Sequence, residues 1–192
     1  MITWTERNNI VDEIKEWSKH TLEVSNPEFN NLPVCPYAKA AWKQAKVDIV
    51  FKFEKEDYKR LYMALHNWSD RKDLVIIADT EYIEDQEEFH EFVDNINEAI
   101  ANNVFRDKDM WVMGFHPEDE PNELFDEEED VEPISEIDYA IFFVQRLSKL
   151  EEAAEKLRPL GYYDKYFQEY DVKHMYELRT NFYRRLRHEE SC

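Results

Sequence analysis

One stretch of the chain combines residue types and spacing that suit chemistry, and it runs from Asn31 to Lys39. Pro36 directly follows Cys35 and suits the first position of a helix, where a missing N–H costs no hydrogen bond. A thiol at a helix start ionises readily, because free N–H groups and the helix dipole stabilise the thiolate. Lys39, one turn further, adds a positive charge. The pattern predicts a reactive thiol at Cys35; the alternative is a small buried hydrophobic residue at a chain reversal.

His116 is the histidine best placed for a site, because it follows a predicted strand at 111–115 and open α/β sheets bind ligands at strand ends. If Cys35 and His116 met in the fold, they would form a nucleophile and base, with Arg146 available to hold an anionic substrate. The alternative for His116 is a hydrogen-bonded surface residue, and the sequence does not show whether these residues meet. We therefore predict Cys35 and His116 as catalytic residues and Lys39 and Arg146 as ligand-binding residues, without deciding whether the protein is an enzyme.

Three motifs carry a resemblance to a known family: residues 35–39 (CPYAK), residues 115–117 (FHP) and the run 139–153 (YAIFFVQRLSKLEEA). In order and approximate spacing, over roughly residues 8–158, they resemble small bacterial proteins catalogued as domain of unknown function 1415. Those proteins show Cys-Pro-Phe-Ala-Lys, Phe-His-Pro and Leu-Arg-x-Ser-type motifs. This chain has Tyr37 in place of the phenylalanine and lacks an Asn-Arg-Ser-Pro-Tyr-Pro segment after His116. The resemblance implies no function, because the family is defined by sequence alone.

Composition indicates a folded protein. Of the 192 residues, 43% are hydrophobic and 15% aromatic, which is too apolar for a disordered chain despite 35% charged residues. The start of the chain has no basic region followed by an apolar run, and no segment approaches 18 consecutive apolar residues. Two cysteines, Cys35 and Cys192, cannot build a disulfide framework. We therefore expect a soluble cytoplasmic protein with no membrane partner.

The formal net charge of −20 argues against direct binding to nucleic acid or anionic membranes. Residues 117–138 contain no Lys or Arg and hold twelve acids: Glu118, Asp119, Glu120, Glu123, Asp126, Glu127, Glu128, Glu129, Asp130, Glu132, Glu136 and Asp138. A cation loop usually needs glycine and fixed ligand spacing, which this segment lacks, so a solvated acidic loop is the favoured interpretation. The run motivates a second hypothesis: an acidic interaction module that binds a basic protein partner as a mimic of nucleic-acid charge.

Metal and cofactor motifs are missing from the sequence. His20, His66 and His90 have no His or Cys partner four residues away. Only two glycines are present, which excludes a glycine-rich phosphate loop. We therefore expect no metal site and no cofactor.

Hydrophobic periodicity predicts alternating helices and strands, with Thr5 as the cap of the first helix. Helices are predicted at about 5–20, 36–44, 55–68, 85–100 and 147–157, and strands at 47–53, 74–78, 111–115 and 139–144. Strand 47–53 alternates in polarity, typical of one buried face, whereas the continuous apolar run Leu74–Ala78 predicts a central strand. The order predicts an α/β fold, with α+β as the alternative: a mixed four-stranded sheet layered with amphipathic helices and extra helices at both termini.

We assign residues 1–160 to a single α/β domain and residues 161–192 to an aromatic and basic helical extension packed on it. Apolar residues recur at helical spacing near the end of the chain: Met175, Leu178, Phe182 and Leu186. Basic residues accompany them: Lys173, Arg179, Arg184, Arg185 and Arg187. In so acidic a chain, we expect this stripe to face the acidic surface of its own domain or of a second copy in a homodimer.

Overall fold

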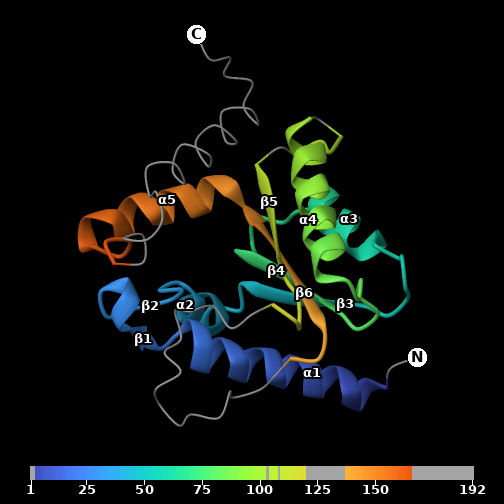
Figure 1. Cartoon of the computed structure of the whole chain (residues 1–192), viewed down its shortest axis with the longest axis horizontal. Coiled ribbons are helices and arrows are strands. Elements are labelled where there is room, and N and C mark those ends of the chain that lie inside the picture. Colours follow the sequence, from blue (N-terminus) through green and yellow to red (C-terminus); the bar gives the residue numbers. More distant parts are fainter. Residues whose placement is uncertain (1–2, 103, 108, 120–136, 166–192) are drawn as a thin grey trace.

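The computed structural model describes residues 3–102, 104–107, 109–119 and 137–165, and its centre is a four-stranded sheet (Figure 1). The strands are β3 (Val47–Lys52), β4 (Leu74–Asp79), β5 (Met110–Phe115) and β6 (Ala140–Arg146). Their order in the sheet is β3-β4-β6-β5. β3 and β4 are parallel, and β6 runs antiparallel to its neighbours β4 and β5. This arrangement confirms the predicted α/β class, the mixed sheet and the central position of β4.

Two helices cover one face of the sheet, α3 (Lys59–His66) and α4 (Gln86–Ala101) (Figure 1). Their apolar stripes pack on the strands around the fully buried Phe89. α4 begins where the sequence predicts, because the Asp85 side chain accepts a hydrogen bond from the N–H of Glu88 at 2.9 Å. The helix therefore has a defined start beside the carboxyl end of β4.

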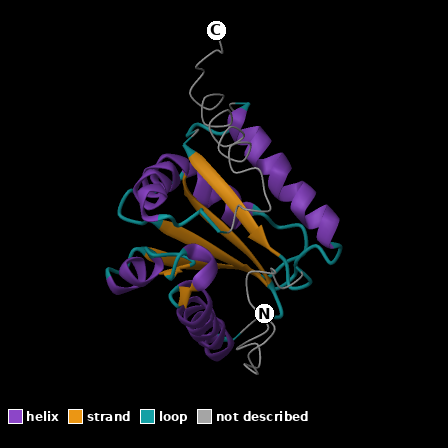
Figure 2. Cartoon of the chain, turned by 60° about the vertical axis from the view of Figure 1, so that its left-hand side comes forward, coloured by secondary structure: helices purple, strands orange, loops and turns teal. Residues whose placement is uncertain are grey.

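The opposite face is covered by α1 (Trp4–Trp17), whose Ile14 is fully buried against the sheet (Figure 2). The predicted cap at Thr5 is wrong. Thr3 caps the helix, since its hydroxyl accepts from the N–H of Glu6 while the Glu6 carboxylate accepts from the N–H of Thr3. The cap of α1 thus lies two residues earlier in the chain than the cap predicted from the sequence.

A third, smaller apolar cluster joins the N-terminal part of the chain to α5 (Leu147–Leu157). A short hairpin, which the sequence analysis did not predict, pairs β1 (Ser25–Asn26) with β2 (Leu32–Pro33). The buried residues of the cluster are Phe29, Leu157 and Tyr162. The Tyr162 hydroxyl donates to the Val34 carbonyl, which ties the end of α5 to the hairpin.

None of the described helices is long and apolar enough to cross a membrane. Most of the predicted acidic loop, residues 120–136, lies outside the described residues, and so does the predicted helical extension from residue 166 onward. The described chain ends at Lys165, shortly after α5.

Candidate functional site

Cys35 lies in a turn that precedes α2 (Ala38–Lys43). The N–H of Ala38 donates to the Cys35 carbonyl at 3.1 Å, so Pro36 and Tyr37 form the turn and the helix begins two residues later than predicted. Burial raises the pKa of the Cys35 thiol, and hydrogen bonds from the N–H groups of Tyr37 and Ala38 offset only part of that rise. The direction of the shift is opposite to that of an activated thiol.

Lys39 is exposed on α2 and forms no ion pair with any of the described residues. No contact therefore holds its ammonium group over Cys35. The predicted ligand-binding role of Lys39 gains no support from its position.

His116 directly follows β5 and is only 4% exposed. Its Nδ1 accepts a hydrogen bond from the N–H of Glu118 at 3.1 Å, so Nε2 carries the ring proton and donates to the Ile83 carbonyl at 2.9 Å. The rings of Tyr82 and Phe89 pack against the imidazole. Both ring nitrogens are occupied, and the neutral side chain joins the end of β5 to the loop before α4. This arrangement leaves no ring nitrogen free to act as a base.

Asp119 fastens the first residues of the acidic segment to α4. Its Oδ1 accepts from Gln86 at 2.8 Å and contacts the His90 Nε2 at 2.7 Å, while Oδ2 accepts from the N–H of His116 at 2.7 Å. Burial acts to raise the pKa of Asp119, but these hydrogen bonds together outweigh it and lower the pKa. The carboxylate therefore stays charged and keeps the chain beside α4.

Arg146 ends β6 and is surrounded by carboxylates. Its Nε donates to Asp70 at 2.8 Å, and its Nη1 lies 3.0 Å from Asp107 and 3.6 Å from Asp109. A hollow of about 270 Å³ beside it is lined by Trp68, Asp70, Lys72, Asp73, Arg146 and Lys149. Three carboxylates already balance the guanidinium charge, so Arg146 offers little attraction for an anionic ligand.

The structure does not bring His116 and Arg146 together. Met110, the first residue of β5, pairs with Arg146, whereas His116 follows the last residue of the same strand. At about 3.3 Å per residue, these two positions lie about 20 Å apart along β5. One small ligand cannot contact both side chains.

Cys35 and His116 lie on different sides of the sheet. The N–H of Cys35 donates to the Leu22 carbonyl at 2.8 Å, and Leu22 packs in the core beneath α1. His116 packs on Phe89 in the core beneath α3 and α4. The predicted nucleophile and base therefore do not form a pair in this fold.

No family model, curated protein or solved structure matches this chain. The resemblance to domain of unknown function 1415 stays a prediction from its three motifs. Among the described residues, no group of three or more His, Cys, Asp or Glu side chains is arranged to hold a metal ion.

The sequence analysis missed a buried ion pair at the carboxyl ends of β3 and β4. Lys52 Nζ lies 2.8 Å from Asp79 Oδ1, and the two side chains are 1% and 0% exposed. Lys52 also donates to the Glu81 carbonyl at 2.6 Å and lies 4.8 Å from the centre of the Tyr58 ring. Asp79 Oδ2 has no hydrogen-bond partner in the described part of the chain. Burial raises the pKa of Asp79 although Lys52 opposes the rise.

The outer face of α4 is the second feature that the sequence analysis missed. The sequence contains no Lys or Arg between Lys72 and Arg106. Within the described residues, the contact between an acid and a basic side chain of α4 joins Asp119 to His90. Exposed acids without an ion pair there lie on the helix and its cap: Asp85, Glu87, Glu88, Glu91, Asp94 and Glu98. This face could have been predicted from the sequence, because a long run of residues without Lys or Arg coincides there with acids at helical spacing.

Proposed function

We propose that the protein is an acidic interaction module whose α4 face binds a basic protein partner in place of nucleic acid. The support comes from the density of charge on α4. From the cap Asp85 to Glu98 the chain rises about 20 Å along the helix axis, so the six exposed acids are spaced on average about 4 Å apart along that axis. A strand of DNA presents one charge per about 3.4 Å of axis. A basic protein surface that binds the phosphates of DNA would find a similar density of negative charge on α4.

The positions of the later acids carry the proposal, because helix stability does not explain them. Acids in the first turn favour a helix by compensating its dipole. Glu98 instead lies in the last turn, which contains no basic residue. Glu91 follows Glu87 by four residues and precedes Asp94 by three, and such like-charge neighbours cost about 0.2–0.5 kcal/mol each. Folding alone therefore disfavours these carboxylates, whereas a bound cationic surface would remove the repulsion.

Neutralisation of Glu91, Asp94 and Glu98 tests the proposal. The variant E91Q/D94N/E98Q should bind fluorescein-labelled nona-arginine about tenfold more weakly than the wild type at about 20 mM ionic strength. Three screened charges at about 0.5 kcal/mol each give that factor. Fluorescence anisotropy measures the affinity, and the same titration at about 150 mM ionic strength should show much weaker binding for the wild type.

The control removes the same net charge elsewhere. Asp12, Glu16 and Glu155 are exposed on α1 and α5, and each already pairs with a neighbouring basic residue. The variant D12N/E16Q/E155Q should change the affinity by less than about threefold. Equal losses in the two variants would show that only overall charge matters, and wild-type binding that does not depend on salt would also contradict the proposal.

A further inference from the structure

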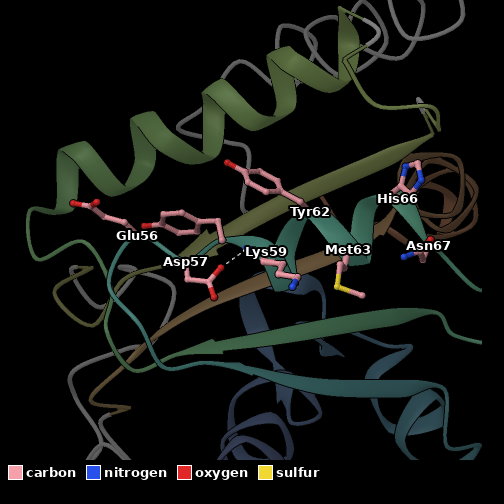
Figure 3. A pocket seen from close by; sticks show the side chains of 8 residues that line it. Glu56, Asp57, Lys59, Tyr62, Met63, His66 and Asn67 are labelled. Atoms are coloured by element: carbon pink, nitrogen blue, oxygen red, sulfur yellow. Dashed lines mark hydrogen bonds between the residues drawn. The ribbon is translucent and has the colours of Figure 1, made fainter. Parts of the chain in front are cut away.

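The outer face of α3 carries a hollow of about 430 Å³ (Figure 3). Tyr62 and Met63 line it and are 42% and 43% exposed. Glu56 and Asp57 contribute carboxylates to its lining, and Lys59 contributes an ammonium group. Neighbouring exposed apolar side chains with a charged rim are typical of an interaction site. The hollow offers the apolar contact area that the acidic face of α4 lacks.

This hollow adjoins α4. Tyr58, which lines it, packs on Phe92 of α4 with ring centroids 4.2 Å apart, and Tyr62 lies 6.1 Å from Phe105, just beyond α4. Figure 3 shows α4 running beside α3 with Tyr62 pointing toward it. Packed helices lie about 8–10 Å apart and a helix with side chains is about 10–12 Å wide. One ligand of helical width can therefore contact the hollow and the acids of α4 together.

The chain itself contains a segment with matching chemistry at its C-terminal end. Residues 172–188 carry five basic residues and one acid, Glu177, so their charge is opposite to that of α4. Four apolar residues recur there at helical spacing: Met175, Leu178, Phe182 and Leu186. This segment lies outside the described residues.

The chain beyond Lys165 is long enough for the basic residues of this segment to reach α4. When extended, residues 166–171 span up to about 20 Å before the segment begins, and the chain from residue 166 to Arg184 spans up to about 60 Å, whereas a domain of this size has a radius of gyration of about 16 Å. Tethering also raises the local concentration of the segment to the millimolar range. A segment attached to the same chain can therefore occupy the surface even when its intrinsic affinity is low.

We propose that residues 172–188 bind across the hollow of α3 and the acidic face of α4 in the same chain. The apolar side chains would cover Tyr62 and Met63, and the basic side chains would neutralise the acids of α4. This inference rests on the proposed function in using the same acidic face. The segment would then compete with an external basic partner, and a partner must displace it to bind.

A spin label on Cys192 tests the contact in the full chain. The substitution C35S leaves Cys192 as the single site of labelling. We expect paramagnetic attenuation of amide NMR signals from α3 and α4, and its loss in the variant R184E/R185E/R187E. The control K39E/K43E/R71E changes the net charge equally at exposed positions and should keep the attenuation. Absence of attenuation on α3 and α4 overturns the proposal.

Two further measurements distinguish contact within one chain from contact between copies, and test whether the segment competes with a basic partner. A mixture of isotope-labelled chain and spin-labelled chain without isotope reports contacts between copies, and attenuation seen only there would overturn binding within one chain. Nona-arginine should bind R184E/R185E/R187E about tenfold more tightly than K39E/K43E/R71E, because the competitor is lost. Equal affinities of the two variants for nona-arginine would show that the segment does not compete with a basic partner. If attenuation is present but nona-arginine binds no variant, the internal contact holds and the proposed function fails.

Discussion

Replacement of Lys52 with methionine tests how the buried ion pair contributes to the fold. Lys52 Nζ lies 2.8 Å from Asp79 Oδ1, with both side chains almost fully excluded from solvent. The substitution keeps most of the side-chain volume but leaves the Asp79 carboxylate buried without its cation. Removal of one partner of such a pair costs about 3–5 kcal/mol. For a domain of this size, that loss lowers the melting temperature by about 6–20 °C.

The loss should depend on pH in a defined direction. Burial already raises the pKa of Asp79, and Lys52 opposes that rise, so removal of Lys52 raises the pKa further. When the pKa of a buried acid is higher in the folded state than in the unfolded state, the free energy of unfolding falls as the pH rises through the folded-state pKa. Below the unfolded-state pKa of about 3.9 the acid is protonated in both states and causes no such loss. The difference between K52M and the wild type should therefore be largest near neutral pH and shrink as the pH falls toward 4.

Urea denaturation followed by circular dichroism measures these free energies at neutral and acidic pH. The double variant K52M/D79L should recover more than half of the loss, because no buried charge remains. As a control, K72M removes the partly exposed pair between Lys72 and Asp48 and should cost less than about 1 kcal/mol. A K52M loss below about 1 kcal/mol near neutral pH, or a double variant no more stable than K52M, would refute the reasoning.

Two other predictions concern packing and the thiol. Gly114→Ala should destabilise the fold by about 1–3 kcal/mol, since the new methyl group would lie 2.6 Å from Phe89 and 2.7 Å from Val93; an unchanged urea midpoint would contradict this. In a C192S variant, Cys35 should react slowly with iodoacetamide at neutral pH and show an apparent pKa above the free value of about 8.5, because burial raises it. An apparent pKa below about 8 would show that the thiol is activated.

Elements with strong local signals were predictable from the sequence. The apolar run of β4 (Leu74–Asp79) indicated a strand covered on both faces, and it pairs with β3 and β6. The apolar spacing of the chain predicted a helix at about 85–100, close to the observed α4 (Gln86–Ala101). These features follow from residues near one another in the chain, so one sequence is enough to find them.

Contacts between distant segments were not predictable in this way. Lys52 and Asp79 come from different strands, and the alternation in strand 47–53 placed Lys52 on a polar face rather than in the core. The three carboxylates around Arg146 come from the loops after α3 and α4. The ring protonation of His116 depends on backbone groups of two loops. Each depends on the register of strands and the path of loops, which periodicity does not specify.

The position of β6 bears on how the chain folds during synthesis. Among the described strands β6 is the last to be made, yet it lies between β4 and β5, so Ile141 pairs with Ala78 on one side and with Phe115 on the other. Until β6 leaves the ribosome, no strand joins β4 to β5. The apolar surfaces of α3 and α4 then have only part of the sheet to pack against. Unpaired strand edges and exposed apolar surface promote aggregation. The nascent chain is therefore most prone to aggregation after β5 has been synthesised and before β6, which ends at Arg146, is complete.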